Sequence, residues 1–144
     1  MKLGRATGVA LFAGALLPAQ QDFSRSVAMK QLMLDLIHPA SNEILLSVNR
    51  GGPQNDSEWA GVRRSALTLA ESGDLLMLPG RVREQGDWAK NAKMLSEAGM
   101  AAYKAAESKD VKALGAVTDA IDAACTGCHK QYRPNVFPRG DGSK

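Results

Sequence analysis

Residues 111–133, VKALGAVTDAIDAACTGCHKQYR, predict the last helix of the chain and decide its fold. Apolar and small residues recur here at alternating intervals of three and four, which is the spacing of a helix seam that faces a bundle core. The seam consists of Val111, Leu114, Thr118, Ile121, Cys125, Cys128 and Tyr132. We expect the helix to begin near residues 108–110 and to end before Pro134, because a proline disfavours helical backbone at the residue preceding it. Both cysteines therefore belong to the core-facing stripe.

Three earlier stretches show the same helical periodicity, at residues 22–48, 57–76 and 87–106, with breakers between them. Asp56 or Ser57 is the expected N-cap of the second stretch and Asp87 that of the third, while Pro39 is expected to kink the first. The three seams comprise Met29, Met33, Leu36, Ala40, Ile44 and Val48; Trp59, Val62, Ala66, Leu69, Gly73 and Leu76; and Trp88, Ala92, Leu95, Gly99, Ala102 and Ala106. No segment alternates as a strand does. The sequence predicts an all-α protein, an antiparallel up-down-up-down four-helix bundle.

The N-terminus has the features of an export signal: Lys2 and Arg5 precede an apolar run over residues 9–17, followed by Pro18 and Ala19. We expect residues 1–19 to be removed and residues 20–144 to form the folded domain. The run is shorter than the roughly 20 apolar residues of a membrane-spanning helix, so we expect no membrane span in the mature protein. Loss of Lys2 and Arg5 leaves 16 basic groups against 15 acidic ones, and this balance argues against nucleic-acid binding.

The run Cys125-Thr126-Gly127-Cys128-His129 has the C-x-x-C-H spacing of covalent haem attachment. Each cysteine thiol can form a thioether to one haem vinyl group, and the histidine that follows the second cysteine can reach the iron. On a helix these three residues are related as i, i+3 and i+4, so they project from one face. A zinc site would need about four ligands, and the sequence does not offer such a set. A redox dithiol would accompany a βαβ pattern, which the sequence also lacks. The motif therefore predicts one haem c.

The sixth ligand of the iron would decide what the haem does. A methionine thioether in that position gives a low-spin iron suited to electron transfer, whereas an open position gives a gas-binding haem. Met29 and Met33 lie one turn apart on the first predicted helix. Core packing is the alternative role for either residue, since methionine commonly fills gaps. We predict that one of the two coordinates the iron.

The chain resembles the class II c-type cytochromes, the cytochrome c prime superfamily. The resemblance is carried by residues 125–133, CTGCHKQYR, similar to the family ending C-x-x-C-H-x-x-Y-R, and by residues 30–33, KQLM, in the first helix. It implies a periplasmic four-helix bundle with iron ligated by His129 and, as in the low-spin members, by Met33 rather than Met29. It also implies that Arg133 lies near the haem propionates. Many high-spin members have an arginine in the first helix, and in this chain Met29 occupies the corresponding position.

These observations predict a periplasmic one-electron carrier rather than an enzyme. Its partners would be redox proteins that dock weakly through a small patch around the haem edge, including Lys130 and Arg133. The alternative is a five-coordinate protein that binds nitric oxide or carbon monoxide, and Met33 is the residue that separates the two hypotheses. Whether the bundle forms a homodimer, as many relatives do, is left open by the sequence.

Overall fold

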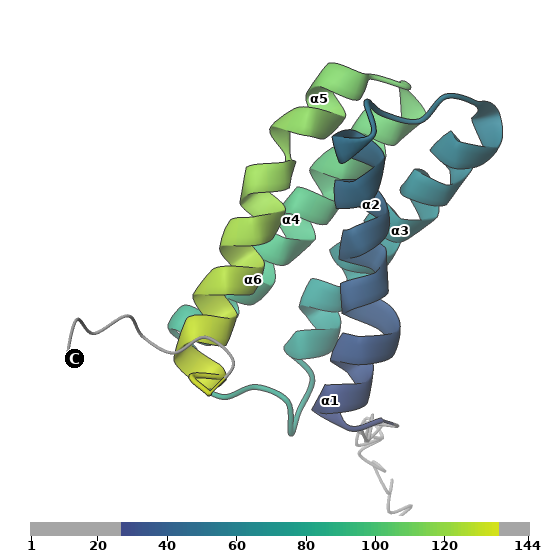
Figure 1. Ribbon diagram of the computed structural model, residues 1–144. Coiled ribbons are helices and arrows are strands. Elements are labelled where there is room, and N and C mark those ends of the chain that lie inside the picture. The colour runs from purple at the N-terminus through teal and green to yellow at the C-terminus, as the bar shows by residue number, and fades with distance from the viewer. Residues whose placement is uncertain (1–26, 136–144) are drawn as a thin grey trace, which may run out of the picture.

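The computed structural model describes residues 27–135, so the predicted signal segment and the first residues of the first predicted helix lie outside the described part of the chain. The first helical arm consists of α1 (Met29–Leu32), the π-helical turn η1 (Met33–Ile37) and α2 (His38–Asn49). The second and third arms are α3 (Asp56–Leu76) and α4 (Asp87–Glu107). The fourth is divided into α5 (Val111–Ala116) and α6 (Thr118–Tyr132). Figure 1 shows these four arms side by side, joined by short connections.

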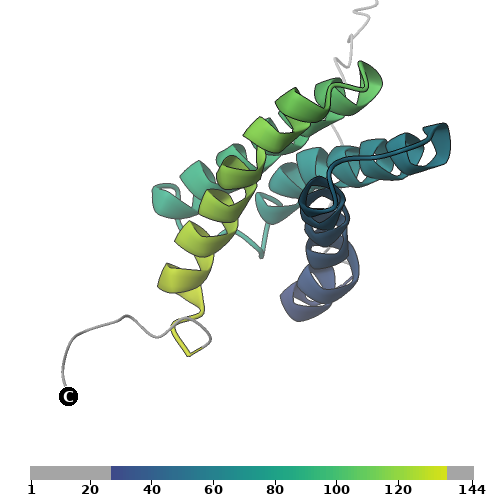
Figure 2. The ribbon, with the colours of Figure 1, turned by 45° about the horizontal axis from the view of Figure 1, so that its top comes forward.

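The four arms form the predicted helical bundle, and residues 27–135 contain no strand. Helix α3 packs along α4, α4 packs along α6, and α2 packs along α3, whereas α2 and α6 contact each other far less. The turned view in Figure 2 shows the first arm diverging from α6 toward the end of the bundle that holds α1. The all-α bundle architecture is thus confirmed. None of the described helices has the length and hydropathy that a membrane crossing requires.

The core is built mainly from aliphatic and alanine side chains, as the low aromatic content predicts. Every residue of the predicted second and third seams is buried. Trp59 and Trp88 are 7% and 3% exposed and anchor the beginnings of α3 and α4 in this core. Ile44, Val62, Leu69, Leu114 and Ile121 are completely buried. Their burial removes apolar surface from water, which is the main favourable contribution to folding.

Small residues let α3 and α4 approach closely. A Cβ atom added at Gly99 would lie 2.3 Å from the backbone nitrogen of Ala70, and one added at Gly73 would lie 2.5 Å from the carbonyl oxygen of Ala92. The Ser96 hydroxyl donates a hydrogen bond of 2.8 Å to the carbonyl of Ala70 across the same interface. Close helix approach therefore accounts for the glycine in the second half of α4.

The first arm departs from the predicted register. Leu36 was expected in the core but is 37% exposed, whereas Leu32 and Ile37 are each 4% exposed. The cause is η1, in which the chain closes an i→i+5 turn and so shifts the buried face by one residue. Pro39 lies just after η1 in the chain. It has no N–H to donate to the Asp35 carbonyl, and its ring would crowd that carbonyl in a regular helix. A wide turn thus accompanies the proline that was expected to kink the helix.

Two local predictions are corrected by the structure. The N-cap of α3 is Asn55, whose side chain accepts a 3.0 Å hydrogen bond from the Glu58 backbone, rather than Asp56 or Ser57. Asp87 is the first residue of α4 and not its cap. At the beginning of α4, the Glu84 carboxylate accepts hydrogen bonds from the backbone N–H groups of Gly86 and Trp88. N–H groups at the start of a helix have no carbonyl partner within the helix, so Glu84 satisfies these two donors.

The fourth arm is also less regular than its sequence pattern predicts. It begins where expected, with the Asp110 side chain accepting a 2.9 Å hydrogen bond from the Ala113 N–H. The α-helix is interrupted at Val117, which separates α5 from α6. Val111, the first residue of the predicted seam, is 41% exposed. The continuous core-facing stripe therefore starts at Leu114.

The connection between α3 and α4 is held by donors that reach the last turn of α3. Trp88 Nε1 donates 3.0 Å to the Leu76 carbonyl, and Arg81 Nη1 donates 3.1 Å to the Leu75 carbonyl. Carbonyl groups in a final helical turn have no partner within the helix, and a cation there is favoured by the helix dipole. The 5% exposed Arg81 therefore has a structural role at the end of α3.

Candidate functional site

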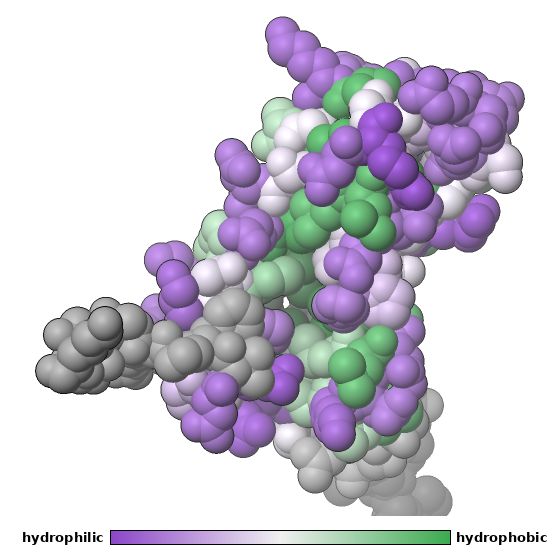
Figure 3. Space-filling view, viewed as in Figure 1, coloured by the Kyte–Doolittle hydropathy of each residue, from purple (hydrophilic) through white to green (hydrophobic). Residues whose placement is uncertain are grey.

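A cavity of about 320 Å³ lies between the first arm and α6. Residues of η1 and α2 line one side and residues of α6 line the other, with Leu76 of α3 and Asn91 and Leu95 of α4 completing the lining. The space-filling view in Figure 3 shows a hollow with hydrophobic surface between these two parts of the molecule. Sites for small molecules and cofactors commonly occupy roughly 300–1,000 Å³ and are mainly apolar. The cavity has the size and lining of such a site.

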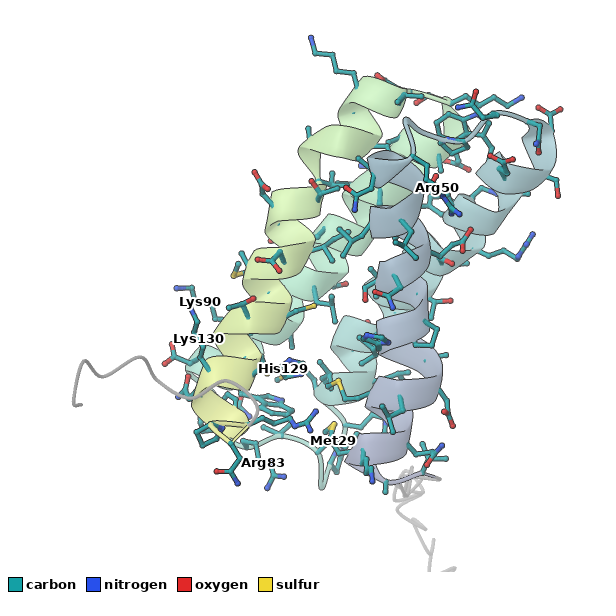
Figure 4. The ribbon with its side chains drawn as sticks, in the orientation of Figure 1. Met29, Arg50, Arg83, Lys90, His129 and Lys130 are labelled. Atoms are coloured by element: carbon teal, nitrogen blue, oxygen red, sulfur yellow. The ribbon has the colours of Figure 1, made fainter. Side chains whose placement is uncertain are left out.

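Helix α6 brings the whole C-x-x-C-H motif to this cavity. Cys125, Cys128 and His129 all contribute to its lining, as their i, i+3 and i+4 relation on one helix requires. Figure 4 shows His129 extending from α6 into the space between α6 and the first arm, while the neighbouring Lys130 points to the outside. Both cysteines are free thiols, and they do not form a disulfide with each other. The two sulfurs and the imidazole therefore converge on one space.

The cavity environment favours the uncharged forms of these three groups. Burial, and secondarily the charge of Asp122, raises the pKa of the Cys125 thiol. Burial, with a smaller effect of Cys125, raises the pKa of Cys128 to about 11. Burial also lowers the pKa of His129, and the nearby positive charge of Arg133 lowers it further. Desolvation disfavours a thiolate and an imidazolium alike. The side chains thus meet the cavity as neutral thiols and a neutral imidazole.

Met33 lies on the opposite wall. Of the five methionines in residues 27–135, it is the only one that lines the cavity. Met29, the other candidate ligand, is partly buried against the core near the start of α1 (Figure 4). Met77 and Met94 likewise pack against the core, and Met100 is 40% exposed on α4. The predicted site residues Met33, Cys125, Cys128 and His129 are therefore brought together by the fold, whereas Met29 is not among them.

Arg133, the remaining predicted site residue, also lines the cavity, just beyond the end of α6. Its guanidinium is available to an anionic group at this end of the site. Arg133 is exposed, and the helix dipole favours a cation at this end of a helix. Its contribution to the cavity lining makes it part of the site.

Several lining residues were not identified from the sequence. His38 is exposed, but it lines the cavity together with Asn42 from α2. Leu34 and Leu45 add apolar surface on the same wall. The core seam predicted from the sequence continued from Met33 through Leu36 and Ala40, so it did not include these residues.

The end of α6 is fixed by contacts of Tyr132, three residues after His129. Its ring meets that of Trp88 edge to face, and its hydroxyl donates a hydrogen bond to the Glu84 carboxylate. That hydrogen bond, with those from the Trp88 and Gly86 backbones, lowers the pKa of Glu84. Burial and, secondarily, Glu84 raise the pKa of Tyr132 to about 12. These contacts tie the last turn of α6 to the beginning of α4.

The residues present fit a covalently attached haem c. The group needs two thiols at this spacing, an adjacent imidazole and an apolar enclosure, and the cavity contains all of them. Two small residues neighbour these ligands on α6: Gly127 lies between the two cysteines, and Ala124, which precedes Cys125, also lines the cavity. The nearest atom to a Cβ added at Gly127 would be Asn91 Oδ1, at 2.6 Å. Helix α4 thus approaches the attachment motif closely through Asn91.

Comparison with protein families gives one match: residues 79–133 match the family described as Cytochrome C'. The matched segment comprises the α3–α4 connection, α4, α5 and α6, and includes Cys125, Cys128, His129 and Arg133. Met33 and the rest of the first arm lie outside it. No curated protein and no solved structure matches the chain. The resemblance to the class II c-type cytochromes is confirmed by the family match.

Proposed function

We propose that this chain, whose residues 79–133 match the Cytochrome C' family, is a class II c-type cytochrome that carries single electrons between proteins by means of one haem c. The observation that carries the proposal is the position of Met33, which lines the cavity opposite Cys125, Cys128 and His129. A protein-derived sulfur on that side is the feature expected of low-spin His/Met ligation.

The chain's own residues have distinct parts in this proposal. Cys125 and Cys128 would hold the haem by two thioether bonds, each formed by adding a thiol sulfur to one vinyl carbon and its hydrogen to the other, which would need no oxidant. His129 would ligate the iron through an imidazole nitrogen, and Met33 would supply a thioether sulfur as a further ligand. When bound, the haem supplies a ferric/ferrous couple that exchanges one electron without making or breaking a substrate bond.

The position of these residues supports a carrier rather than a catalyst. Cys125, Cys128 and His129 belong to one helix whose end is held by Tyr132. Rigid placement limits the rearrangement of ligands that accompanies a change of oxidation state. Ser41 and Asn42 are polar lining residues on the Met33 side, but the Ser41 hydroxyl already donates 2.9 Å to the His38 carbonyl. No acid–base pair for substrate chemistry is evident at this wall among the described residues.

Basic side chains surround the motif end of α6. Lys130, Lys90 and Arg83 lie on the outside at this end of the molecule (Figure 4), and all three are exposed. We propose that they, with Arg133, guide an acidic redox partner toward the haem edge. Complementary charges mainly raise the rate of association, and salt screens them. The rate of electron exchange with such a partner is expected to fall as ionic strength rises.

The proposal also includes export of the protein to the periplasm. The signal-like residues 1–19 would direct the chain to the periplasm, where haem c is expected to be attached. Mass spectrometry of the protein isolated from a cell that makes haem c tests this directly. The expected mass corresponds to the chain without residues 1–19, plus one haem. Retention of Lys2 and Arg5 in the mature protein would contradict export by this signal.

The decisive experiment on function compares absorption and magnetic-resonance spectra of the wild-type haem protein with those of Met33→Leu and Met29→Leu. Leucine has nearly the volume of methionine and removes only the sulfur, so packing is largely preserved. The wild type is expected to be low-spin and to show the sulfur-to-iron charge-transfer band. Met33→Leu is expected to lose this band and Met29→Leu to retain it.

Other outcomes distinguish the remaining hypotheses. Loss of the band in Met29→Leu but not in Met33→Leu would assign the sulfur ligand to Met29. A wild-type protein that is high-spin when ferrous and takes up carbon monoxide readily would overturn the carrier proposal. That result would favour a five-coordinate haem that binds carbon monoxide or nitric oxide.

A further inference from the structure

The π-turn η1 alters which side chains of the first arm share a face. In a regular α-helix, residues five positions apart point about 140° away from each other, because each residue turns the chain by about 100°. In η1, the backbone N–H of His38 bonds to the carbonyl of Met33, five residues earlier. Its backbone hydrogen bond spans five residues instead of four, so the chain turns less per residue than in an α-helix. The angle between Met33 and His38 is therefore smaller than the roughly 140° of a regular helix.

The cavity lining agrees with this register. Met33 and His38 both line the cavity, on the wall opposite Cys128 and His129. A thioether and an imidazole are the two neutral side-chain ligands that haem proteins most commonly place on iron. The first arm thus presents two such donors to a site that could use only one of them at a time. Isolated π-turns are frequent at functional sites, and this one lies between the two donors.

The surroundings of His38 leave its ring free to bind elsewhere. The Asn42 side-chain nitrogen lies 3.4 Å from each ring nitrogen, beyond the usual range of about 2.7–3.2 Å for a nitrogen hydrogen bond. The ring is exposed rather than packed into the core, so its reorientation disrupts no buried contact. A histidine ligand commonly donates its second ring N–H to a neighbouring acceptor. The Asn42 amide oxygen could provide that acceptor after a rotation of the amide.

We propose that His38 is a second iron ligand, able to take the sixth coordination position when the Met33 sulfur does not occupy it. The inference rests on the proposed attachment of haem c to Cys125 and Cys128, and on the position of Met33 and His38 on the same wall of the cavity. Methionine ligation raises the reduction potential of a c-type haem, so ligation by His38 gives a lower potential. One chain can then hold its haem in two ligation states with different potentials.

The test compares the ferric haem proteins Met33→Leu, His38→Ala and the double variant by electron paramagnetic resonance, near-infrared absorption and potentiometric titration. In Met33→Leu we expect a low-spin signal without the sulfur-to-iron band and a midpoint potential below that of the wild type. In the double variant we expect the low-spin signal to be lost and a high-spin signal to replace it. His38→Ala alone is expected to retain the wild-type band. Met29→Leu is the matched control for loss of a methionine from the same arm and is expected to resemble the wild type.

Each contrary result has a separate meaning. The inference is overturned if Met33→Leu is as fully high-spin as the double variant, while the wild type still shows the sulfur-to-iron band; the proposed function would then stand. It is equally overturned if the double variant stays low-spin, because another residue would then be the ligand. A wild-type protein without covalent haem contradicts both proposals. Circular dichroism of each variant checks that the helices are intact, and Met33→Ala repeats the test if the leucine blocks the iron.

Discussion

The ring of Tyr132 meets the ring of Trp88 edge to face, with centroids 4.9 Å apart and planes inclined by 78°. Tyr132 is the last residue of α6 and Trp88 the second of α4. The pair therefore joins the end of the helix that carries the cysteines to the beginning of the helix beside it. Edge-to-face geometry is the favoured arrangement for aromatic rings at this separation. The Tyr132 hydroxyl adds a hydrogen bond to Glu84, which also receives the free N–H of Trp88.

The ring and the hydroxyl of Tyr132 are expected to contribute separately to stability. Tyr132→Phe keeps the contact with Trp88 and removes only the hydrogen bond to Glu84, so it should lower the midpoint of thermal unfolding slightly. Tyr132→Ala removes both and should lower it further. Thermal unfolding followed by circular dichroism measures both changes. Equal effects of the two substitutions would show that the ring contact contributes nothing.

The hydrogen bonds to Glu84 predict a specific acid sensitivity. Its pKa is below the ordinary value of 4.5 in the folded protein, first because of Tyr132 and then because of the Trp88 backbone. A carboxyl with a lowered folded-state pKa stabilises the fold above its unfolded-state pKa, and this contribution is lost as the pH falls through the folded-state pKa. Glu84→Gln should therefore be less stable than the wild type near neutral pH, and the difference should disappear well below pH 4.5.

Denaturant unfolding of both proteins over a series of pH values measures this difference. Tyr132→Phe provides the control, because it removes the largest cause of the pKa shift and should reproduce part of the effect. A difference between Glu84→Gln and the wild type that grows as the pH falls would contradict the proposed role. Alkaline titration of tyrosinate absorbance gives a second measurement. Glu84→Gln should lower the pKa of Tyr132 from about 12, but it should stay above 10.0, because burial is the largest cause of its rise.

Two glycines in helices predict opposite effects of the same substitution. Gly99→Ala would place a Cβ 2.3 Å from a backbone atom of α3, and such overpacking costs about 1–3 kcal/mol. Gly115→Ala in α5 meets only the Val48 side chain, at 3.9 Å, and alanine is favoured over glycine in a helix by up to about 1 kcal/mol. Denaturant unfolding should show Gly99→Ala destabilised and Gly115→Ala unchanged or stabilised. A stabilised Gly99→Ala would mean that α3 and α4 do not approach as closely as they do here.

The two cysteines should each retain haem by an independent thioether. Cys125→Ala and Cys128→Ala are each expected to keep haem bound to the chain after denaturation, through the remaining cysteine. The double variant is expected to release all of it. Mass spectrometry under denaturing conditions measures the covalent adduct, with Thr126→Ala as a control that leaves both thiols in place. Covalent haem in the double variant would place the attachment elsewhere.

The haem motif and the bundle were predictable because both depend on short-range helix geometry. Cys125, Cys128 and His129 share a face of any α-helix, and the structure places all three at one cavity. The seams of α3 and α4 follow the same three-four spacing and are buried as predicted. Errors were confined to helix ends and to breaks in the pattern, such as the N-cap Asn55 and the interruption at Val117. At those points side-chain hydrogen bonds compete with periodicity.

The sequence by itself therefore determined the helical class, the C-x-x-C-H motif and the resemblance to the class II c-type cytochromes. The residues alone left both Met29 and Met33 as candidate ligands, and the resemblance favoured Met33. Tertiary structure places Met33, and not Met29, at the cavity. It also places His38 there, which the sequence pattern did not predict. Pro39 marks an irregular point in the sequence, but the residues that face α6 depend on how the first arm packs against α3 and α6, and a local pattern of residues does not contain that packing.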